Sequence, residues 1–346
     1  MSESYEGRQI VGMDLHRRRS VLVRMTEAGE RLETVQISND PEYLRQVMAR
    51  AGERPEVVLE ATYGWYWAAD CLAELGASVH LAHPLGVKMF SYRRVKNDER
   101  DAADLADLLR MGRLPEAWIA PPATRELRGW VRHRAKLVGL RSNLKCQIHA
   151  VLAGAGVQVP MSDLFGPGGQ RLLAVCPLPI ESRSRVESLL RLIENLDFEI
   201  DAFARLVAGR LRAHPGYATI QHIPGVGPIL AAVFVAEIGD IARFARAAQL
   251  ASWAGLTPKH HESDTTIHRG RITKQGSRLV RWAAVEAVQR VPARTHLGQI
   301  RDRVAARRGR NIGVVAAARE LTQLVFYGLR DGHIRQLPAP PRVPAA

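Results

Sequence analysis

Short runs of apolar residues, one of them alternating with polar residues, occupy the start of the chain, and such runs are typical of β-strands. Three such runs lie within residues 9–37, and they are separated by charged or glycine-containing turns at His16–Arg19 and Glu27–Glu30, which predicts a meander of hairpins. After Asp40-Pro41 the pattern predicts a helix to about residue 51, a strand at 56–61, a helix at 66–76 and a strand at 78–84. We therefore expect an α/β layer in which some strands pair in parallel.

Three strands followed by alternating helices and strands is the element order of an RNase H-like core, which we expect for residues 1–120. A further helix is predicted at 101–112, and two prolines within 118–124 break the chain. Residues 121–214 are predicted to form a helical linker. It consists of a long helix from Thr124 to about Leu152, a loop or turn at 159–170 and a second helix at about 181–213.

The second linker helix carries apolar residues at alternating steps of three and four over three heptads. They are Val186, Leu189, Ile193, Leu196, Ile200, Phe203 and Val207. The pattern fits a helix that packs on its neighbour in a bundle. It also fits one limb of an antiparallel coiled-coil arm, which could join two copies of the protein.

Residues 215–332 are predicted to form a mostly helical third domain, and the proline-rich residues 333–346 a disordered tail. An apolar helix within 222–240 follows the turn that contains Gly225 and Gly227. Two glycines at this spacing allow a tight turn, and the N–H groups at a helix start can hold a phosphate. A helix-hairpin-helix-like element is one interpretation, and a plain turn before a buried helix is the other.

The charge of the chain is strongly positive, with 49 Lys and Arg against 35 Asp and Glu, and this favours a polyanionic partner. Residues 1–120 have 16 basic and 19 acidic residues, whereas the remainder has 33 and 16. We interpret the first part as able to hold metal and the second as able to bind phosphates, although a solvated basic surface would look the same. The candidate nucleic-acid contacts are Arg125, Arg128, Arg132, Lys136, Gly225, Gly227, Lys259, Arg269, Arg271, Lys274 and Arg278.

The three cysteines, Cys71, Cys146 and Cys176, form no C-x-x-C pair. They predict neither a disulfide framework nor a zinc site, so a reducing cytosol is expected. The first residues lack the basic and apolar regions of a signal peptide, and no apolar run of about 18 residues indicates a membrane span.

Four carboxylates of the acidic part have positions that favour metal chemistry. Asp14 and Glu60 end apolar strands, and Asp98 and Asp101 lie three apart at the start of a helix, which places them on one helical face. Strand ends and a helix N-terminus can meet at one edge of a sheet, where four carboxylates are tolerable only with divalent cations. Oxygen ligands suit Mg²⁺, and two such ions about 4 Å apart would promote phosphoryl transfer.

Each acid also has an ordinary interpretation when taken alone. Asp14 could be a turn residue at a strand end, and Asp98 or Asp101 could cap a helix. Asp104 and Asp107 continue the same spacing, but they lie deeper in the helix and are expected to face solvent.

Serine and histidine residues occur in the basic region 250–288, which we expect to contain a loop around Ser263. A serine hydroxyl is a weak nucleophile unless a base or a metal activates it, and spacing alone does not favour Ser263 over Ser252 or Ser277. His260, His261 and His268 lack zinc-ligand spacing with cysteine and are interpreted as polar loop residues.

Five segments together resemble one family. VGMDLHRRRSVLV, VVLEATYGWY and KNDERDAADLADLL resemble the three acidic motifs of the DEDD-type insertion-sequence transposases. HIPGVGPILAAVFVAEIGD and AGLTPKHHESDTTIHRGRITKQGSRLVRWAAVEA resemble the C-terminal transposase domain of the same family. The resemblance covers about 5–335 in the same order, and the family includes the pilin-gene inverting recombinase and the bridge-RNA-guided recombinases.

This resemblance implies a RuvC-like domain whose Mg²⁺-binding tetrad maps to Asp14, Glu60, Asp98 and Asp101, a coiled-coil linker and a C-terminal transposase domain. It also implies a nucleophilic serine, which maps to Ser263. That serine would attack a DNA phosphate, form a phosphoserine intermediate and complete the tetrad of another subunit. Asp264 stands where relatives commonly have glycine.

The partners implied by the resemblance are donor and target double-stranded DNA and a structured guide RNA whose loops pair with both. A homodimer or tetramer in the bacterial cytoplasm, associated with the nucleoid and without a membrane, is expected. Two other functions fit parts of the sequence. A structure-specific nuclease that uses water would need the tetrad but not Ser263, and a non-catalytic nucleic-acid-binding protein would need neither.

Overall fold

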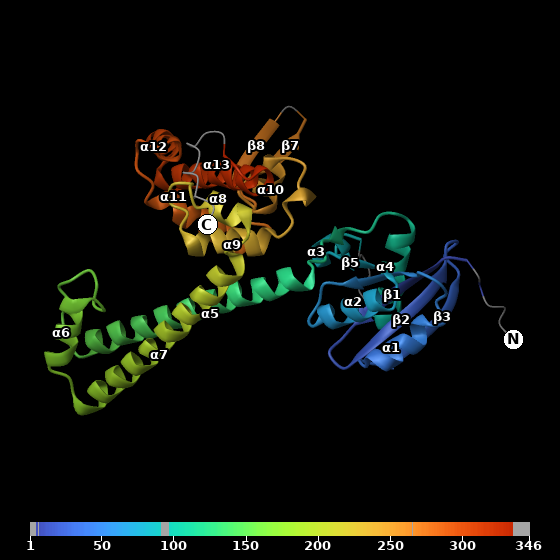
Figure 1. The fold of residues 1–346 in the computed structure, drawn as a ribbon, viewed down its shortest axis with the longest axis horizontal. Coiled ribbons are helices and arrows are strands. Elements are labelled where there is room, and N and C mark those ends of the chain that lie inside the picture. Colours follow the sequence, from blue (N-terminus) through green and yellow to red (C-terminus); the bar gives the residue numbers. More distant parts are fainter. Residues whose placement is uncertain (1–4, 6, 91–96, 265, 335–346) are drawn as a thin grey trace, which may run out of the picture. The chain divides into compact units, whose positions relative to one another are not determined.

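The computed structural model describes residues 5, 7–90, 97–264 and 266–334, apart from the side chains of residues 261 and 267–269. The chain divides into two compact units, residues 1–119 and residues 120–346 (Figure 1). The first unit contains a six-stranded sheet, and the second is mostly helical.

The sheet of the first unit has the strand order β3-β2-β1-β4-β5-β6. Its strands are β1 (Gln9–Leu15), β2 (Arg19–Thr26), β3 (Arg31–Ser38), β4 (Glu56–Glu60), β5 (Ser78–Ala82) and β6 (Glu116–Ala117). β1 pairs in parallel with β4, and β4 with β5, whereas the other neighbours are antiparallel. The predicted meander and the parallel pairing are confirmed, and β6 is a short strand that the sequence did not predict.

Helices cover both faces of this sheet, because successive side chains of a strand point to opposite faces. Val11 and Met13 of β1 pack in one cluster with residues of α1 (Pro41–Met48) and α2 (Trp65–Glu74). Ile10 of β1 packs in another cluster with Ala102 and Ala106 of α4 (Asp98–Arg110). A short helix, α3 (Pro84–Val87), follows β5. This mixed α/β arrangement is consistent with the predicted RuvC-like domain.

Two long helices, α5 (Pro122–Gly154) and α7 (Ile180–Leu211), begin the second unit and confirm the two predicted linker helices. Leu127 and Val207 share one hydrophobic cluster, whereas Ile148 and Val186 share another, so the two helices run antiparallel. Of the predicted heptad residues, Val186, Leu189, Ile193, Ile200 and Val207 are buried. These positions face into the helix pair.

A helix that the sequence did not predict, α6 (Pro167–Val175), lies between α5 and α7, and the loop or turn predicted at 159–170 is therefore wrong in its last residues. Its sequence starts with Pro-Gly-Gly, and because proline and glycine have the lowest helix propensities, the local sequence does not indicate a helix. Contacts with distant residues stabilise it: Leu173 lies in the cluster that contains Ile148, and Arg183 donates hydrogen bonds to the carbonyls of Leu173 and Cys176.

The rest of the second unit is a bundle of helices, as predicted. These are α8 (Pro215–Ile220), α9 (Pro228–Ile238), α10 (Ala247–Trp253), α11 (Arg278–Gln289), α12 (His296–Arg308) and α13 (Arg310–Asp331), with a 3-10 turn at Ile241–Arg243. The region around Ser263, which we expected to be a loop, is instead a β-hairpin formed by β7 (Pro258–Ser263) and β8 (Thr266–Ile272).

Among the described residues, α13 alone is long and apolar enough to cross a membrane by length and composition. Half of its apolar stretch is buried inside the unit, and Leu321 and Phe326 are fully buried in the hydrophobic core. α13 is therefore a core helix of this bundle. Ile334 also packs on this core, and residues 335–346 of the predicted tail lie outside the described residues.

Candidate functional site

The ends of two parallel strands carry the first two predicted carboxylates. Met13 of β1 pairs with Leu59 of β4, so Asp14 and Glu60 follow at neighbouring strand ends. By strand alternation Asp14 lies on the same face as Ile10, and Glu60 on the same face as Val58. Ile10 packs on α4, and Val58 contacts Leu105 of α4. Both carboxylates therefore belong to the face that α4 covers.

A glycine allows α4 to come very close to β1. A Cβ atom added to Gly12 would lie 1.8 Å from the carbonyl oxygen of Ala102 and 3.1 Å from the backbone nitrogen of Ala106. Because real carbon–oxygen contacts are about 3.3 Å, no other residue fits at Gly12 without moving the helix. This contact fixes the start of α4 beside the end of β1, two residues before Asp14.

The N-terminus of α4 is capped by Asn97, whose side-chain oxygen accepts a hydrogen bond from the backbone N–H of Glu99 at 2.9 Å. The capping role that we considered for Asp98 or Asp101 therefore belongs to their neighbour. The carboxylate of Asp98 instead lies 3.4 Å from the Arg19 guanidinium, at the start of β2.

Among the described residues, Asp14, His16 and Asp98 form a group that could hold a metal ion, with ligand atoms all within 4.8 Å of one another. Nε2 of His16 lies 3.1 Å from Oδ2 of Asp14 and 3.3 Å from Oδ2 of Asp98. The whole Asp14 residue is only 8% exposed, whereas the side chain of Asp98 is 33% exposed. The cluster thus has a buried and a solvent-accessible side.

Sequence reasoning missed His16, which we treated as a turn residue. A signal was present, because Asp14 and His16 are two residues apart at the end of a strand and such residues share a face. The structure also brings together only part of the predicted tetrad in this cluster. Glu60 and Asp101 lie nearby in the backbone, at the next strand end and one helical turn beyond Asp98, but outside the three-residue group.

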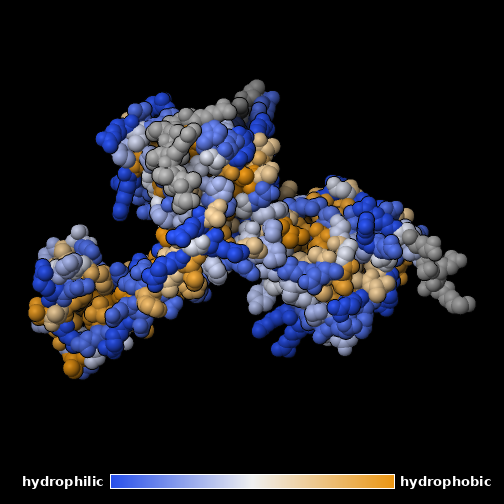
Figure 2. Space-filling view, in the orientation of Figure 1, coloured by the Kyte–Doolittle hydropathy of each residue, from blue (hydrophilic) through white to orange (hydrophobic). Residues whose placement is uncertain are grey.

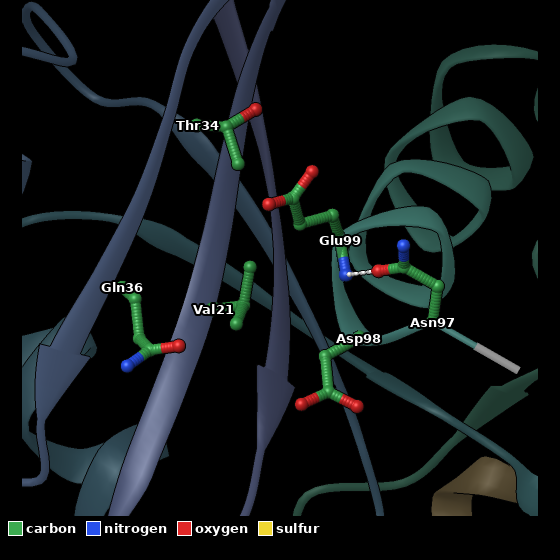
Figure 3. Close-up of a pocket in the computed structure, with 6 residues that line it drawn as sticks. All are labelled: Val21, Thr34, Gln36, Asn97, Asp98 and Glu99. Carbon is green, nitrogen blue, oxygen red and sulfur yellow. Dashed lines mark hydrogen bonds between the residues drawn. The ribbon is translucent and has the colours of Figure 1, made fainter.

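A surface groove of about 320 Å³ adjoins the cluster. Figure 3 shows Thr34 and Gln36 of β3 on one side, Asp98 and Glu99 of α4 on the other, and Val21 of β2 between them. Solvent and small ions can therefore reach Asp98 from this side. Asp104 is exposed, as predicted, whereas Asp107 is half-buried and accepts a hydrogen bond from Arg110 of the same helix at 3.0 Å.

The predicted nucleophile Ser263 is exposed at the end of β7, where it pairs with Thr266 of β8. The next residue, Asp264, has φ of +51°, in the left-handed region that glycine adopts without strain. Ser277 has a structural role instead: it caps α11 by accepting from the N–H of Val280, and it donates to Glu237 at 2.9 Å.

Two of the predicted nucleic-acid contacts are engaged within the chain. Arg132 forms a two-pronged ion pair with the buried carboxylate of Glu237, at 2.7 and 3.0 Å, and Arg128 donates to the carbonyls of Ala236 and Glu237 at the end of α9. Burial raises the pKa of Glu237. The hydrogen bonds from Arg132 and Ser277 and the charges of Arg132 and Arg128 lower it by more than burial raises it, so the pKa of Glu237 is below its ordinary value. These contacts anchor α5 to α9.

The other candidate nucleic-acid contacts differ in how exposed they are. The side chains of Lys136, Lys259, Arg271, Lys274 and Arg278 are exposed, and Arg125 is half-buried. The side chain of Arg269 lies outside the described residues. Gly225 has φ of +90°, and a Cβ there would lie 2.2 Å from the carbonyl oxygen of Ala287 in α11, whereas Gly227 has open space. Close packing on α11 is thus a sufficient reason for glycine at residue 225.

Comparison with known proteins gives two family matches in the order expected from the sequence. Residues 11–156 match the model of the DEDD-type IS110 transposases, described as "Transposase", and residues 217–305 match that of the "Transposase IS116/IS110/IS902 family". The chain belongs to the IS110 family of transposases. The first match spans the carboxylates at the β1 and α4 ends, and the second spans the β7–β8 hairpin.

Individual IS110-family relatives are similar over much of their length. A "probable family 20 transposase" of Pseudomonas aeruginosa is 26% identical, over 65% of this chain and 68% of its own. A protein of insertion element IS116 of Streptomyces clavuligerus is 25% identical, over 96% of both chains. The transposase of insertion sequence IS1111A of Coxiella burnetii is 24% identical, over 78% of this chain and 76% of its own.

Members of the IS110 family are enzymes that cleave and rejoin DNA, so this chain is an enzyme of the transposase class with DNA as a partner. DEDD-type transposases use a divalent metal ion, and the side chains of Asp14, His16 and Asp98 could hold one. The donor chemistry fits, because carboxylate oxygens and an imidazole nitrogen are both ligands for divalent ions.

Proposed function

We propose that this IS110-family transposase is a site-specific recombinase that uses Mg²⁺ held by Asp14, Glu60, Asp98 and Asp101 and a serine nucleophile, Ser263. The observation that carries the proposal is the contact of α4 with Gly12, together with the 3.1 and 3.3 Å distances that join Asp14 and Asp98 through His16. Carboxylates held this close repel one another, and a divalent cation removes that repulsion.

When bound, the ion would supply a Lewis acid for phosphate oxygens. Asp14, Glu60, Asp98 and Asp101 would hold it at the edge of the sheet, where the groove beside Asp98 leaves room for substrate. The rigid position of α4 on β1 would keep these carboxylates aligned during the reaction.

Ser263 would carry the strand exchange. Its Oγ forms a bond to a DNA phosphorus as one P–O bond of the backbone breaks, the serine proton leaves to solvent or a base, and the released deoxyribose oxygen takes up a proton. The resulting phosphoserine linkage conserves the phosphodiester energy, so a second deoxyribose hydroxyl can attack it, rejoin the DNA and release the serine. The exposed position of Ser263 at the end of a hairpin is compatible with access to DNA.

The basic side chains of the second unit would bind the nucleic acids. Lys136, Lys259, Arg271, Lys274 and Arg278 are exposed and would face phosphates in this proposal, and Arg125, Arg269 and the turn at Gly225 and Gly227 would be further contacts. Arg128 and Arg132 would act by fixing α5 to α9. A structured guide RNA would select donor and target DNA by base pairing, while the protein reads the shape and backbone of the duplexes.

The assembly would be a homodimer or a dimer of dimers joined by the α5–α7 helices as a coiled-coil arm. Large apolar side chains are exposed along these helices, including Leu140, Leu192, Phe198 and Leu206. Figure 2 shows hydrophobic surface near the end of the pair that carries α6. Exposed apolar surface of this kind is typical of interaction sites.

In the same proposal the chain has a RuvC-like domain (1–120), a linker (121–214), a transposase domain with a helix-hairpin-helix-like turn (215–332) and a tail (333–346). It would act at the nucleoid in the cytoplasm.

The deciding experiment traps the covalent intermediate. The full chain is incubated with Mg²⁺, the RNA transcribed from the DNA beside its gene and labelled DNA containing the element ends, and protein–DNA adducts are separated under denaturing conditions. We expect an adduct with the wild type, none with Ser263→Ala, and an undiminished adduct with Ser252→Ala, an exposed serine of α10. The linkage site is then read by peptide mass spectrometry.

Each outcome decides between the functions considered. Cleavage without an adduct, retained in Ser263→Ala but lost in Asp14→Asn, would identify a nuclease that uses water. Binding of nucleic acid without any cleavage, with or without Mg²⁺, would identify a non-catalytic protein. An adduct that forms without RNA would refute the guided part of the proposal alone.

A further inference from the structure

We propose that the imidazole of His16 is itself a ligand of the divalent ion held by Asp14 and Asp98, so that the ion occupies a mixed nitrogen and oxygen site. This inference rests on the proposed metal-dependent function, but it concerns a residue to which the DEDD pattern gives no role. It predicts a different metal preference from that of four carboxylates alone.

The distances between the three side chains match those of ligands around one ion. In an octahedral site with bonds of about 2.1 Å, adjacent ligand atoms are separated by about 3.0 Å. Nε2 of His16 lies 3.1 Å from Oδ2 of Asp14 and 3.3 Å from Oδ2 of Asp98. One nitrogen thus faces one oxygen from each carboxylate at the spacing of adjacent ligands.

The backbone around His16 is held on both sides, which favours a functional position over a mobile turn. The N–H of His16 donates to the carbonyl of Arg19 at 3.1 Å, and its own carbonyl accepts from Nδ2 of Asn39 at 2.6 Å. Asn39 is fixed in turn, because its side-chain oxygen accepts from the hydroxyl of the fully buried Ser20 at 2.7 Å. The backbone of His16 is therefore held at a position from which its imidazole reaches both carboxylates.

An imidazole ligand changes which ion the site prefers. Mg²⁺ favours oxygen ligands and water, whereas transition-metal ions gain more from nitrogen. We therefore expect the chain to bind Mn²⁺ at least about tenfold more tightly than Mg²⁺. Removing the imidazole should reduce this difference, because it weakens Mn²⁺ binding more than Mg²⁺ binding.

The test measures metal binding to the full chain in the absence of nucleic acid. Metal-free protein is titrated with Mn²⁺, and the free ion is followed by its electron paramagnetic resonance signal, with Mg²⁺ as competitor. Pulsed measurements on bound Mn²⁺ then detect magnetic coupling to ¹⁴N, which a directly bound imidazole produces and a carboxylate does not. Protein that contains ¹⁵N-histidine identifies the coupled nitrogen as imidazole.

The chain offers a matched control histidine. His80 of β5 also lies between two carboxylates, with Nε2 3.6 Å from Glu56 and Nδ1 3.2 Å from Glu116. It uses two different ring nitrogens that point apart, so one ion cannot bridge its contacts in the same way. We expect ¹⁴N coupling in the wild type and in His80→Ala, and its loss in His16→Ala with Mn²⁺ binding weakened about tenfold or more.

The outcomes separate this inference from the function on which it rests. If Mn²⁺ binds, and Asp14→Asn weakens it, but the wild type shows no imidazole coupling, His16 is not a ligand while the metal function stands. If the wild type binds no Mn²⁺ at millimolar concentration, both fail. Because absence of coupling in the wild type would refute the inference by itself, the inference remains testable even if His16→Ala does not fold.

Discussion

Replacing Gly12 with alanine tests the packing that brings α4 to the candidate metal site. The added Cβ would lie 1.8 Å from the carbonyl oxygen of Ala102 and 2.8 Å from its carbonyl carbon. Since carbon–oxygen contacts are about 3.3 Å, the helix must retreat by about 1.5 Å or tilt at its N-terminal end. Overpacking of this size costs roughly 1–3 kcal/mol of the free energy of unfolding.

The same movement should separate Asp98 from Asp14, because both depend on the position of α4 relative to β1. A displacement of 1 Å at a catalytic group can lower the rate about 10²-fold. We therefore expect Gly12→Ala to lose most DNA cleavage and to bind Mn²⁺ more weakly, while the second unit stays unchanged.

Hydrogen exchange measured by mass spectrometry localises the effect to the first unit. A loss of about 1–3 kcal/mol raises the population of locally open states about 5–150-fold, so amides of β1 and α4 should exchange faster by that factor. The matched control is Gly129→Ala in α5, where a Cβ meets no atom within 4 Å. Unchanged exchange of α4 together with unchanged Mn²⁺ affinity in Gly12→Ala would refute the packing argument.

Two further predictions concern the second unit. Glu237→Gln should lower the free energy of unfolding by roughly 1–3 kcal/mol at pH 7, because Arg132 and Ser277 lose a charged partner. The folded-state pKa of Glu237 is depressed, so its contribution to the free energy of unfolding is present above the ordinary pKa of 4.5 and is lost as the pH falls through the folded-state pKa. Urea denaturation should therefore show that the difference in unfolding free energy between the wild type and Glu237→Gln becomes smaller in acid. A difference that stays constant with pH would contradict this prediction. Asp264→Val should destabilise the β7–β8 hairpin by about 1–2 kcal/mol, because a β-branched residue is strained at φ of +51°, whereas Asp264→Gly should change it by less than about 1 kcal/mol. Equal hydrogen exchange of the hairpin in both variants would count against that reasoning.

Much of the fold could be predicted because its elements carry a local period. β1 and β2 are short apolar runs bounded by turns, β3 alternates apolar and polar residues, and the heptad positions of α7 recur over three heptads. Such patterns indicate which face of a strand or helix is buried, even when the element that packs against it is not known. Asp14 and Glu60 could be placed at strand ends for the same reason.

The elements that were missed depend on contacts between distant residues. β7 and β8 contain His, Arg and Lys rather than an apolar alternation, so only their pairing across the turn at Asp264 makes them strands. α6 similarly depends on packing with α5 and α7. These contacts are not visible in any local window of the sequence.

The candidate site shows the same division. The spacing of Asp98 and Asp101 indicated a shared helical face, but the position of that face beside Asp14 depends on Gly12 accepting the backbone of Ala102. The part played by His16 depends on the turn that Asn39 holds, which joins residues 23 apart in the chain. Sequence reasoning thus found the ligand types but not the contacts that assemble them.

The most direct test of the metal site is a crystal structure of the full chain with Mn²⁺, examined by anomalous diffraction at the manganese edge. We expect an anomalous peak between Asp14 and Asp98, at about 2.1–2.2 Å from an oxygen of each carboxylate. A well-ordered site at these residues without a peak, or a peak bound elsewhere in the chain, would contradict it.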